Sequence, residues 1–306
     1  MDERMVSVSG FTKRYGGVPA VKDVSFEVHR GEIFALLGPN GAGKTSTLES
    51  LEGLRRPDGG ELRVAGIDPA RSPRRLAAAI GVQLQTSALP PAMTVDEAMA
   101  FFCAYHKVRP RRDLLERLGI AASRRTQYGQ LSVGQQRRLT LAVAMAHDPP
   151  VLFLDEPTAG LDEQTRAELH ALVRELRERG TTVLLATHDM AEAEKLADRA
   201  AILLRGEIAA LGTPRQLTAA GSRRTRVSVA TEYGKLAAQE IAFPGAELAS
   251  RADGYVVYLT ADTARTVSAI LAWLDAAADP LVDLRVERPS LEERFLEITT
   301  DKGARA

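Results

Sequence analysis

Residues 38–45 read GPNGAGKT and match the phosphate-loop pattern G-x-x-x-x-G-K-[ST] at every specified position. The apolar run IFALL at 33–37 comes directly before them, and a helix is expected from Thr45 to about Leu54. A buried strand, a glycine-rich turn and a helix, in this order, are the context that the motif requires. We therefore expect the loop N–H groups and the positive end of the helix to bind phosphate groups.

Four side chains around this loop are suited to phosphate chemistry. Lys44 is expected to reach the β- and γ-phosphates of a nucleotide, and Thr45 to offer its hydroxyl group to Mg²⁺. A second apolar run, VLFLDE, ends in two carboxylates. Asp155 is expected to hold the water shell of the metal ion, and Glu156 to orient and deprotonate an attacking water molecule. Such a pair after a strand is usually a solvated loop, but the phosphate loop upstream favours the catalytic interpretation.

Buried strands and helices alternate over the first 220 residues, which predicts an α/β fold with a parallel core sheet. The runs VSVSGF (6–11) and VSFEVH (24–29) predict an additional antiparallel β subdomain. Residues from about 86 to 150 form a mostly helical insert, in which Thr94 and Glu97 have capping-box spacing. The other predicted strands are GVQLQ (81–85), VLFLDEP (151–157), TTVLLATH (181–188) and a hairpin over AILLRGEIAALG (201–212).

The pattern changes after Gly221, so we predict two domains, residues 1–220 and residues 221–306. The second is expected to be a small α+β domain. Its predicted strands are TRVSVAT (225–231), YVVYLT (255–260) and LVDLRVE (281–287), with helices between them such as TARTVSAILAWLDAA (263–277). Ser290 and Glu293 have capping-box spacing and predict a last helix.

A second helix start in the first domain also has the features of an anion site. It reads LSVGQ at 131–135, in which Ser132 and Gln135 have capping-box spacing. The same residues fit a well-capped helix that binds nothing and a helix start that binds an anion, because both depend on unpaired N–H groups at a positive helix end. The local sequence leaves both interpretations open.

Taken together, these motifs resemble the nucleotide-binding subunit of ATP-binding cassette (ABC) transporters, with five motifs in the order of that family. The resemblance implies that Tyr15, in FTKRYGG, stacks on adenine. It also implies that Gln85 contacts Mg²⁺ and reports the nucleotide state to a membrane partner, and that His188 contacts the γ-phosphate. LSVGQ matches the family signature, and AGLD at 159–162 matches a loop that crosses to a second subunit.

The resemblance assigns residues to three roles. Its catalytic residues are Glu156 and His188, and its metal ligands are Thr45, Gln85 and Asp155. The expected nucleotide-binding residues are Tyr15, Gly38, Pro39, Asn40, Gly41, Ala42, Gly43, Lys44, Thr45, Ser46, Gln85, Ser132, Val133, Gly134, Gln135 and Asp162. The implied cofactors are ATP and Mg²⁺.

The resemblance also explains the second helix start. It implies that two copies of the chain meet head to tail, with each nucleotide closed between Lys44 of one copy and Ser132 of the other. ATP would then favour the closed pair, because ADP lacks the phosphate that reaches the signature. Hydrolysis would remove this bridge and let the subunits separate.

One residue departs from the family pattern, because Val133 stands where the family usually has glycine. A β-branched residue would be costly if this backbone needs a positive φ, but valine is tolerable if the residue is already helical. Reduced but real hydrolysis is expected.

The end of the chain points to a subtype of the family. THDMAEAEKLADR at 187–199 and SLEERF at 290–295 resemble bacterial exporter ATPases of the drug- and antibiotic-resistance type, which work with a separate membrane subunit. The expected function is ATP-driven export of a hydrophobic small molecule, at the cytoplasmic face of the cell membrane. The C-terminal domain is expected to be a regulatory or dimer-stabilising module or a contact to the membrane subunit, and the sequence leaves these open.

Composition limits the other possibilities. Forty basic residues balance forty acidic ones, so the chain has no global field that attracts nucleic acid, and no nucleic-acid partner is expected. The alternative is a soluble ABC ATPase that acts on ribosomes or nucleic acid. Such proteins usually carry two cassettes or a long coiled-coil insertion, and this sequence has neither. A GTPase or P-loop kinase would leave the signature and His188 without a role.

Overall fold

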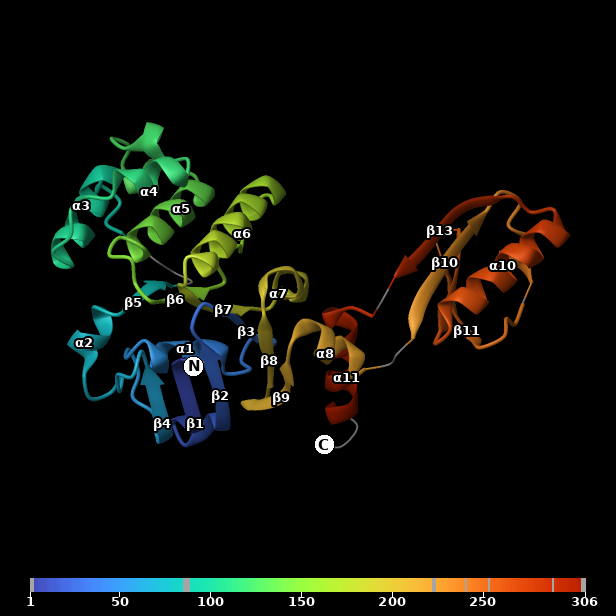
Figure 1. Cartoon of the computed structure of the whole chain (residues 1–306), viewed down its shortest axis with the longest axis horizontal. Coiled ribbons are helices and arrows are strands. Elements are labelled where there is room, and N and C mark those ends of the chain that lie inside the picture. The colour runs from blue at the N-terminus through green and yellow to red at the C-terminus, as the bar shows by residue number, and fades with distance from the viewer. Residues whose placement is uncertain are drawn as a thin grey trace. The chain divides into compact units, whose positions relative to one another are not determined.

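The computed structural model of the chain describes residues 3–84, 89–221, 224–239, 241–252, 254–287 and 289–303 (Figure 1). The chain divides into two compact units, Met1–Pro214 and Arg215–Ala306. The division lies close to the boundary that the sequence predicts at residues 220 and 221. Among the described residues, no helix is both long and apolar enough to cross a lipid bilayer.

A six-stranded sheet forms the centre of the first unit, in the order β5-β6-β7-β3-β8-β9. Its strands are β3 (Ile33–Leu37), β5 (Ile80–Gln83), β6 (Val151–Asp155), β7 (Thr182–Thr187), β8 (Arg199–Leu204) and β9 (Glu207–Gly212). All neighbours pair in parallel except β8 and β9, which form the predicted antiparallel hairpin. Every residue of β3, β6 and β7 is buried, which explains why their sequences are continuous apolar runs. The predicted α/β class is confirmed.

A smaller antiparallel sheet packs beside this core. It consists of β1 (Arg4–Tyr15), β2 (Val18–His29) and β4 (Gly59–Val64), in the order β2-β1-β4. Its apolar side chains share one hydrophobic cluster with the central sheet, in which the rings of Phe26 and Phe34 stack with centroids 5.0 Å apart. The predicted antiparallel subdomain is therefore present, and β4 adds a strand to it that the sequence did not indicate.

Helices complete the first unit. The segment between β5 and β6 contains α3 (Val95–Tyr105), α4 (Arg112–Arg117) and α5 (Val133–Ala144), which together with α6 (Glu163–Glu178) bury a second hydrophobic cluster. Thr94 and Glu97 form the predicted capping box of α3. The other α-helices are α1 (Lys44–Leu51), α2 (Pro73–Ala77) and α7 (Met190–Leu196), and two short 3₁₀ helices lie at Ala121–Ser123 and Tyr128–Gln130.

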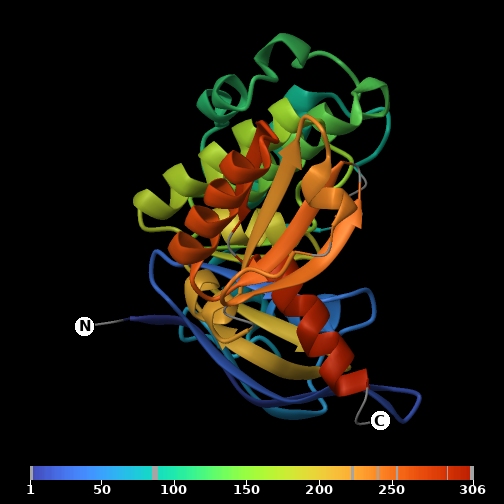
Figure 2. The same ribbon diagram turned by 90° about the vertical axis from the view of Figure 1, so that its right-hand side faces the viewer.

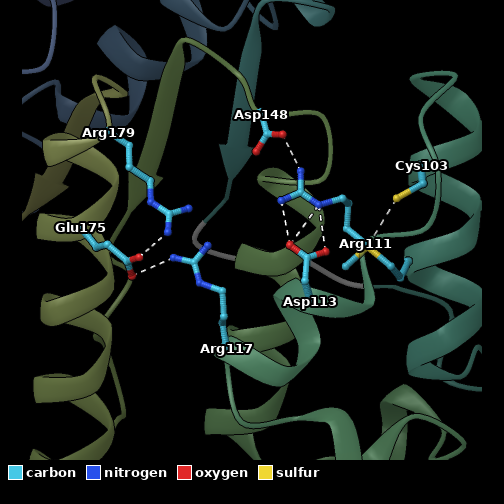
Figure 3. Close-up of polar contacts among 8 residues, drawn as sticks. Cys103, Arg111, Asp113, Arg117, Asp148, Glu175 and Arg179 are labelled. Atoms are coloured by element: carbon cyan, nitrogen blue, oxygen red, sulfur yellow. Dashed lines mark hydrogen bonds and ion pairs between the residues drawn. The ribbon is translucent and has the colours of Figure 1, made fainter.

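Arginine side chains tie the helical segment to the rest of the unit (Figure 3). Arg117 on α4 lies 2.7 Å from Glu175 on α6, and Arg179 pairs with the same carboxylate. Arg111, directly before α4, pairs with Asp113 and also with Asp148 in the loop before β6. These pairs are partly exposed, so they fix the position of α4 more than they stabilise the fold.

The second unit contains a four-stranded antiparallel sheet in the order β11-β12-β10-β13. Its strands are β10 (Thr225–Thr231), β11 (Ala246–Ala252), β12 (Tyr255–Thr260) and β13 (Leu281–Glu287), with α9 (Lys235–Ala238) and α10 (Thr263–Ala277) between them. The helix α10 covers one face of this sheet, where Ile270 and Leu274 join the cluster around Val229 and Tyr258 (Figure 2). The helix α8 (Pro214–Ala219) precedes the sheet and α11 (Leu291–Gly303) follows it, and α11 begins with the predicted capping box of Ser290 and Glu293.

Candidate active site

The loop between β3 and α1 encloses a small cavity at the carboxyl end of the central sheet. The cavity has a volume of about 180 Å³ and is lined by residues 39–46 together with Ala20, Asp155 and Glu156. Two glycines allow the backbone of this loop to follow its course around the cavity. A Cβ atom on Gly38 would lie 2.3 Å from the carbonyl oxygen of Leu203, and Gly43 has a φ of 106°.

Lys44 is the cationic group of this cavity, and its side chain is almost completely buried. Its ammonium group donates hydrogen bonds to the carbonyl oxygens of Gly38 at 2.7 Å and Pro39 at 3.3 Å. Burial lowers the pKa of Lys44, while the nearby carboxylates of Glu156 and Asp155 act in the opposite direction. The lysine is therefore held across the loop, where phosphate oxygens can take the place of the two carbonyl groups.

Two oxygen-bearing side chains meet at the other side of the cavity. The hydroxyl group of Thr45 donates to Asp155 Oδ2 at 3.5 Å. Asp155 is 4% exposed, and burial together with the neighbouring Glu156 raises its pKa to about 6, although Lys44 and Thr45 lower it. Within the described residues, no group of three or more His, Cys, Asp or Glu side chains could hold a metal ion. The hydroxyl and carboxylate oxygens nevertheless fit Mg²⁺, which binds few protein ligands and shares its shell with phosphates and water.

Glu156 and His188 meet although 32 residues separate them in the sequence. Each directly follows the carboxyl end of a buried strand, β6 or β7, and these strands are parallel neighbours. His188 Nδ1 lies 2.8 Å from Glu156 Oε1, with the imidazole largely exposed and the carboxyl group buried. Glu156 also has a φ of 48°, an uncommon value for a residue other than glycine. The backbone turn thus directs this carboxyl group into the cavity.

Tyr15 lies at the end of β1 and is 41% exposed. Its hydroxyl group is 3.1 Å from Ser46 Oγ, which places it beside the first turn of α1. Lys13 and Arg55 lie 5.6 Å and 5.4 Å from the centre of its ring. The tyrosine is therefore next to the phosphate loop, although it does not line the cavity itself.

The signature segment forms the start of α5. Ser132 Oγ accepts a hydrogen bond from the Gln135 N–H group, and Gln135 Oε1 accepts one from the Ser132 N–H group, so the predicted capping box is present. Val133 is the first residue of α5, has no positive φ and is 56% exposed. Valine therefore causes no backbone strain here, because residue 133 is helical and does not need a positive φ. Gly134 follows it in the same helical turn.

Asp162 is the N-cap of α6. Its carboxylate accepts hydrogen bonds from the N–H and hydroxyl groups of Thr165, both at 2.8 Å, and these bonds lower its pKa. Neither Asp162 nor any residue from 131 to 135 lines the phosphate-loop cavity of the same chain. Gln85, the predicted contact of the metal ion, lies outside the described residues. Ala20, contributed by β2, does line the cavity, and no motif in the sequence marked it.

Comparison with known proteins identifies the family. The family model for the ABC transporter matches residues 21–159. The daunorubicin resistance ATP-binding protein DrrA3 of Streptomyces coeruleorubidus is 37% identical over 309 aligned positions, which cover 98% of both chains. This chain belongs to the ABC transporter family. It is an ABC-type ATPase.

Other ABC proteins are similar over different parts of the chain. The linearmycin resistance ATP-binding protein LnrL of Bacillus subtilis is 32% identical and covers 96% of this chain and 98% of its own length. A fluoroquinolones export ATP-binding protein of Mycobacterium tuberculosis is 39% identical over 79% of this chain and 82% of its own.

Solved ABC structures resemble about two thirds of the chain in fold. The ATP-binding subunit of an ABC transporter superposes with a TM-score of 0.66 at 27% identity, covering 70% of this chain and 91% of its own. A dimeric ATP-binding cassette, in a post-hydrolysis state with ADP and phosphate, superposes with a TM-score of 0.63 at 28% identity and covers 68% of this chain and 98% of its own. A nucleotide site in the first unit of this ABC ATPase is consistent with both.

Proposed function

We propose that this ABC ATPase drives the export of a hydrophobic small molecule, of the drug or antibiotic kind, through a separate membrane subunit. The observation that carries this proposal is similarity across both units to two resistance proteins, one for daunorubicin and one for linearmycin. In this proposal, residues 1–220 are the ATPase domain and residues 221–306 an accessory domain. The chain would act at the cytoplasmic face of the membrane, held there by its membrane subunit.

Binding of ATP would use the phosphate loop and its neighbours. The loop N–H groups and Lys44 bind the phosphate groups, and burial of the ammonium group strengthens this attraction. Tyr15, next to Ser46, stacks on the adenine ring. The hydrogen bonds from Lys44 to the carbonyl oxygens of Gly38 and Pro39 hold its ammonium group at the loop, which supports its role in binding phosphate.

Hydrolysis would depend on the buried carboxyl group of Glu156. It takes a proton from the attacking water molecule, and His188, 2.8 Å away, holds the carboxyl group in place and contacts the γ-phosphate. Thr45, Asp155 and Gln85 would hold Mg²⁺ directly or through water. When bound, this ion supplies positive charge that stabilises the developing charge on the phosphate oxygens.

A second copy of the chain would complete each site. We assign this role to Ser132, Val133, Gly134 and Gln135 at the start of α5, with Asp162 in the crossing loop. These residues lie outside the phosphate-loop cavity of their own chain, and the exposed Val133 leaves the helix start accessible. The solved dimeric relative with ADP and phosphate supports an assembly of two cassettes.

In the proposed pair of chains, the bound nucleotide determines whether the two copies associate or separate. ATP contacts both copies and therefore stabilises their association, whereas ADP lacks the phosphate that reaches the second copy. Each round of hydrolysis would then open the pair, and the membrane subunit would receive this motion through the region of Gln85 and the helical segment.

Transport in inside-out membrane vesicles tests the proposal. Vesicles that contain this chain and the membrane subunit with which it assembles should accumulate daunorubicin or a similar hydrophobic drug when Mg²⁺-ATP is added. Vesicles with the Glu156→Gln variant should not. Equal accumulation in both, or recovery of the chain with ribosomes and not with membranes, would refute the export function.

A further inference from the structure

The sheet of the second unit ends in a strand with an unpaired edge. β13 pairs with β10 on one side and has no strand on the other within the described residues (Figure 1). This strand also exposes apolar side chains between its charged ones, because Val282 and Val286 are 66% and 47% exposed and Leu281 is 41% exposed. Exposed edge strands with apolar side chains are sites of strand addition.

The sequence of β13 is complementary to itself when reversed. It reads LVDLRVE from Leu281 to Glu287, with Leu284 at its centre. In an antiparallel pair of two such strands about a two-fold axis at Leu284, Asp283 of each copy lies opposite Arg285 of the other. The same axis places Val282 opposite Val286 and leaves no like charges facing each other.

Charges on edge strands usually prevent association, so their arrangement matters here. A charged residue at the centre of the strand would face its own copy and repel it, but the centre of β13 is Leu284. Asp283 and Arg285 are about one third and more than half exposed, and within one chain they pair with each other at 2.8 Å, while the Tyr255 hydroxyl group donates to Asp283 at 2.6 Å. In a two-fold pair of strands, each would exchange this partner for the opposite charge of the second copy. Pairing of β10 with β13 is regular from Arg226 to Ala230, and its irregularity lies beyond Asp283.

The opposite edge of the sheet lacks this combination. β11 has a register shift between Leu248 and Ser250, which disturbs the middle of the strand. Its two charged side chains have partners within the chain, since Glu247 pairs with Arg224, and Arg251 donates to the Gln239 carbonyl group at 2.9 Å. Asp283 and Arg285 of β13 also have a partner in each other, so the charges do not distinguish the two edges. No large apolar residue of β11 is exposed. A second copy is therefore expected at β13 and not at β11.

We propose that β13 is a self-association site, at which the C-terminal units of two copies join into one eight-stranded antiparallel sheet. The occupant of the free edge is the β13 strand of a second copy of this chain, bound by backbone hydrogen bonds and two Asp283–Arg285 pairs. This two-fold contact needs no nucleotide. It would keep two copies together while the ATPase domains separate after hydrolysis.

The molar mass of the full-length chain without nucleotide tests this contact, because the proposed ATP-dependent pair cannot then contribute. The wild-type chain should be dimeric at high concentration by sedimentation equilibrium. The variants Asp283→Arg and Arg285→Asp should each be monomeric, since each puts like charges opposite each other. Asp275→Arg, an equal charge change on the exposed side of α10, should remain dimeric.

Mixing the two charge variants shows whether they are monomeric because of repulsion between copies or because each substitution disturbs its own chain. A chain with two arginines and a chain with two aspartates are complementary across the two-fold axis, so the mixture should form a dimer although neither variant does alone. A monomeric wild-type chain, a dimer of either single variant, or a mixture that stays monomeric would overturn the proposal.

Disulfide formation tests the register. Asp283→Cys and Arg285→Cys chains should cross-link when mixed and oxidised, because residues 283 and 285 face each other across the axis and opposed residues lie within disulfide range. Each variant alone should give little cross-linked dimer, and the wild-type chain is a control because its single cysteine, Cys103, is buried. Equal cross-linking in the single variants and the mixture would contradict this register.

Discussion

Lys44, Asp155 and Glu156 are each less than a tenth exposed, so three charged side chains share one small volume at the end of the central sheet. Burial disfavours the charged forms of Lys44 and Asp155, and the opposite charges beside them partly offset this cost. The lowered pKa of Lys44 and the raised pKa of Asp155 both have burial as their main cause. At the residue scale, the site is therefore prepared for a ligand that brings both negative phosphates and a cation.

The first prediction concerns the proposed catalytic base. Glu156→Gln keeps the size of the side chain but removes the proton acceptor, so ATP turnover should fall by about 10²- to 10⁴-fold. Nucleotide affinity should stay within a few-fold, because Lys44 and the loop are unchanged. Turnover and fluorescent-ATP binding measure the two effects. Glu163→Gln, at an exposed position of α6, is the matched control and should behave like the wild-type chain. Turnover of Glu156→Gln near the wild-type rate would exclude this role.

A buried carboxyl group near the site predicts a pH effect on stability. Glu52 is 7% exposed, neither of its carboxyl oxygens has a hydrogen-bond partner among the described residues, and burial together with Asp155 raises its pKa to about 8. Between its ordinary value of 4.5 and 8, the folded chain keeps a proton that the unfolded chain releases. This group should therefore reduce the stability of the first unit as the pH rises through that range.

Glu52→Gln should remove this loss. The variant should unfold at nearly the wild-type temperature at pH 5 and at a clearly higher temperature at pH 8, because one pKa unit corresponds to about 1.4 kcal/mol. Melting curves by circular dichroism at several pH values measure the difference. Glu61→Gln, at an exposed position of β4, should leave the unfolding temperature unchanged at both pH 5 and pH 8. A parallel pH dependence in Glu52→Gln and the wild-type chain would contradict the assignment.

At the element scale, two helices of the first unit begin with the same capping arrangement. Thr94 caps α3 and Ser132 caps α5, each with a reciprocal bond from the residue three positions later. Their contributions to helix stability should therefore be similar. Only α5 carries the signature, so in the proposed assembly a nucleotide held by the second copy contacts the start of α5 and not the start of α3.

The third prediction compares these caps. Ser132→Ala and Thr94→Ala should each destabilise the first unit by about 1 kcal/mol, as loss of an N-cap does. Ser132→Ala should also lower ATP turnover by about tenfold or more, because a hydrogen bond to a charged group is lost. Thermal unfolding and steady-state turnover give the two values. If both variants lost turnover equally, Ser132 would be a structural cap only.

A fourth prediction concerns Val133, which is helical and unstrained. If Val133 lowers ATP turnover, the cause would then be the size of its exposed side chain, which would crowd the second copy. Val133→Gly should raise ATP turnover and leave the melting temperature unchanged or slightly lower, because glycine disfavours a helix. The ATP turnover of Val133→Ala should lie between that of Val133→Gly and that of the wild-type chain. Turnover below that of the wild-type chain in Val133→Gly would contradict this explanation.

How far the sequence predicts each element depends on its residues. β3, β6 and the β8–β9 hairpin were predictable, because buried strands need continuous apolar runs. β11 was missed, because AELASRA contains no β-branched or aromatic residue and its place follows from pairing with β12. The contact between Glu156 and His188 depends on which strands are neighbours, and the helical φ of Val133 depends on the start of α5. Sequence motifs named these residues but could not supply that geometry.

At the scale of the whole molecule, we propose that the nucleotide site divides between two copies. One chain holds Lys44, Asp155, Glu156 and His188 together, while its own signature residues lie outside that cavity. In this proposal, a single copy has the phosphate-binding half of the site and lacks the second helix end. In the proposed assembly, ATP joins the ATPase domains reversibly, and β13 keeps the two chains together throughout the cycle.

The most direct test of ATP as a bridge between two copies is the molar mass of one double variant by light scattering. Glu156→Gln is expected to slow hydrolysis strongly, and Asp283→Arg is expected to remove the nucleotide-independent contact at β13. This chain should be monomeric without nucleotide and with ADP, and dimeric with saturating Mg²⁺-ATP. A chain that binds ATP but stays monomeric would contradict the central claim, because the nucleotide would then hold no second copy.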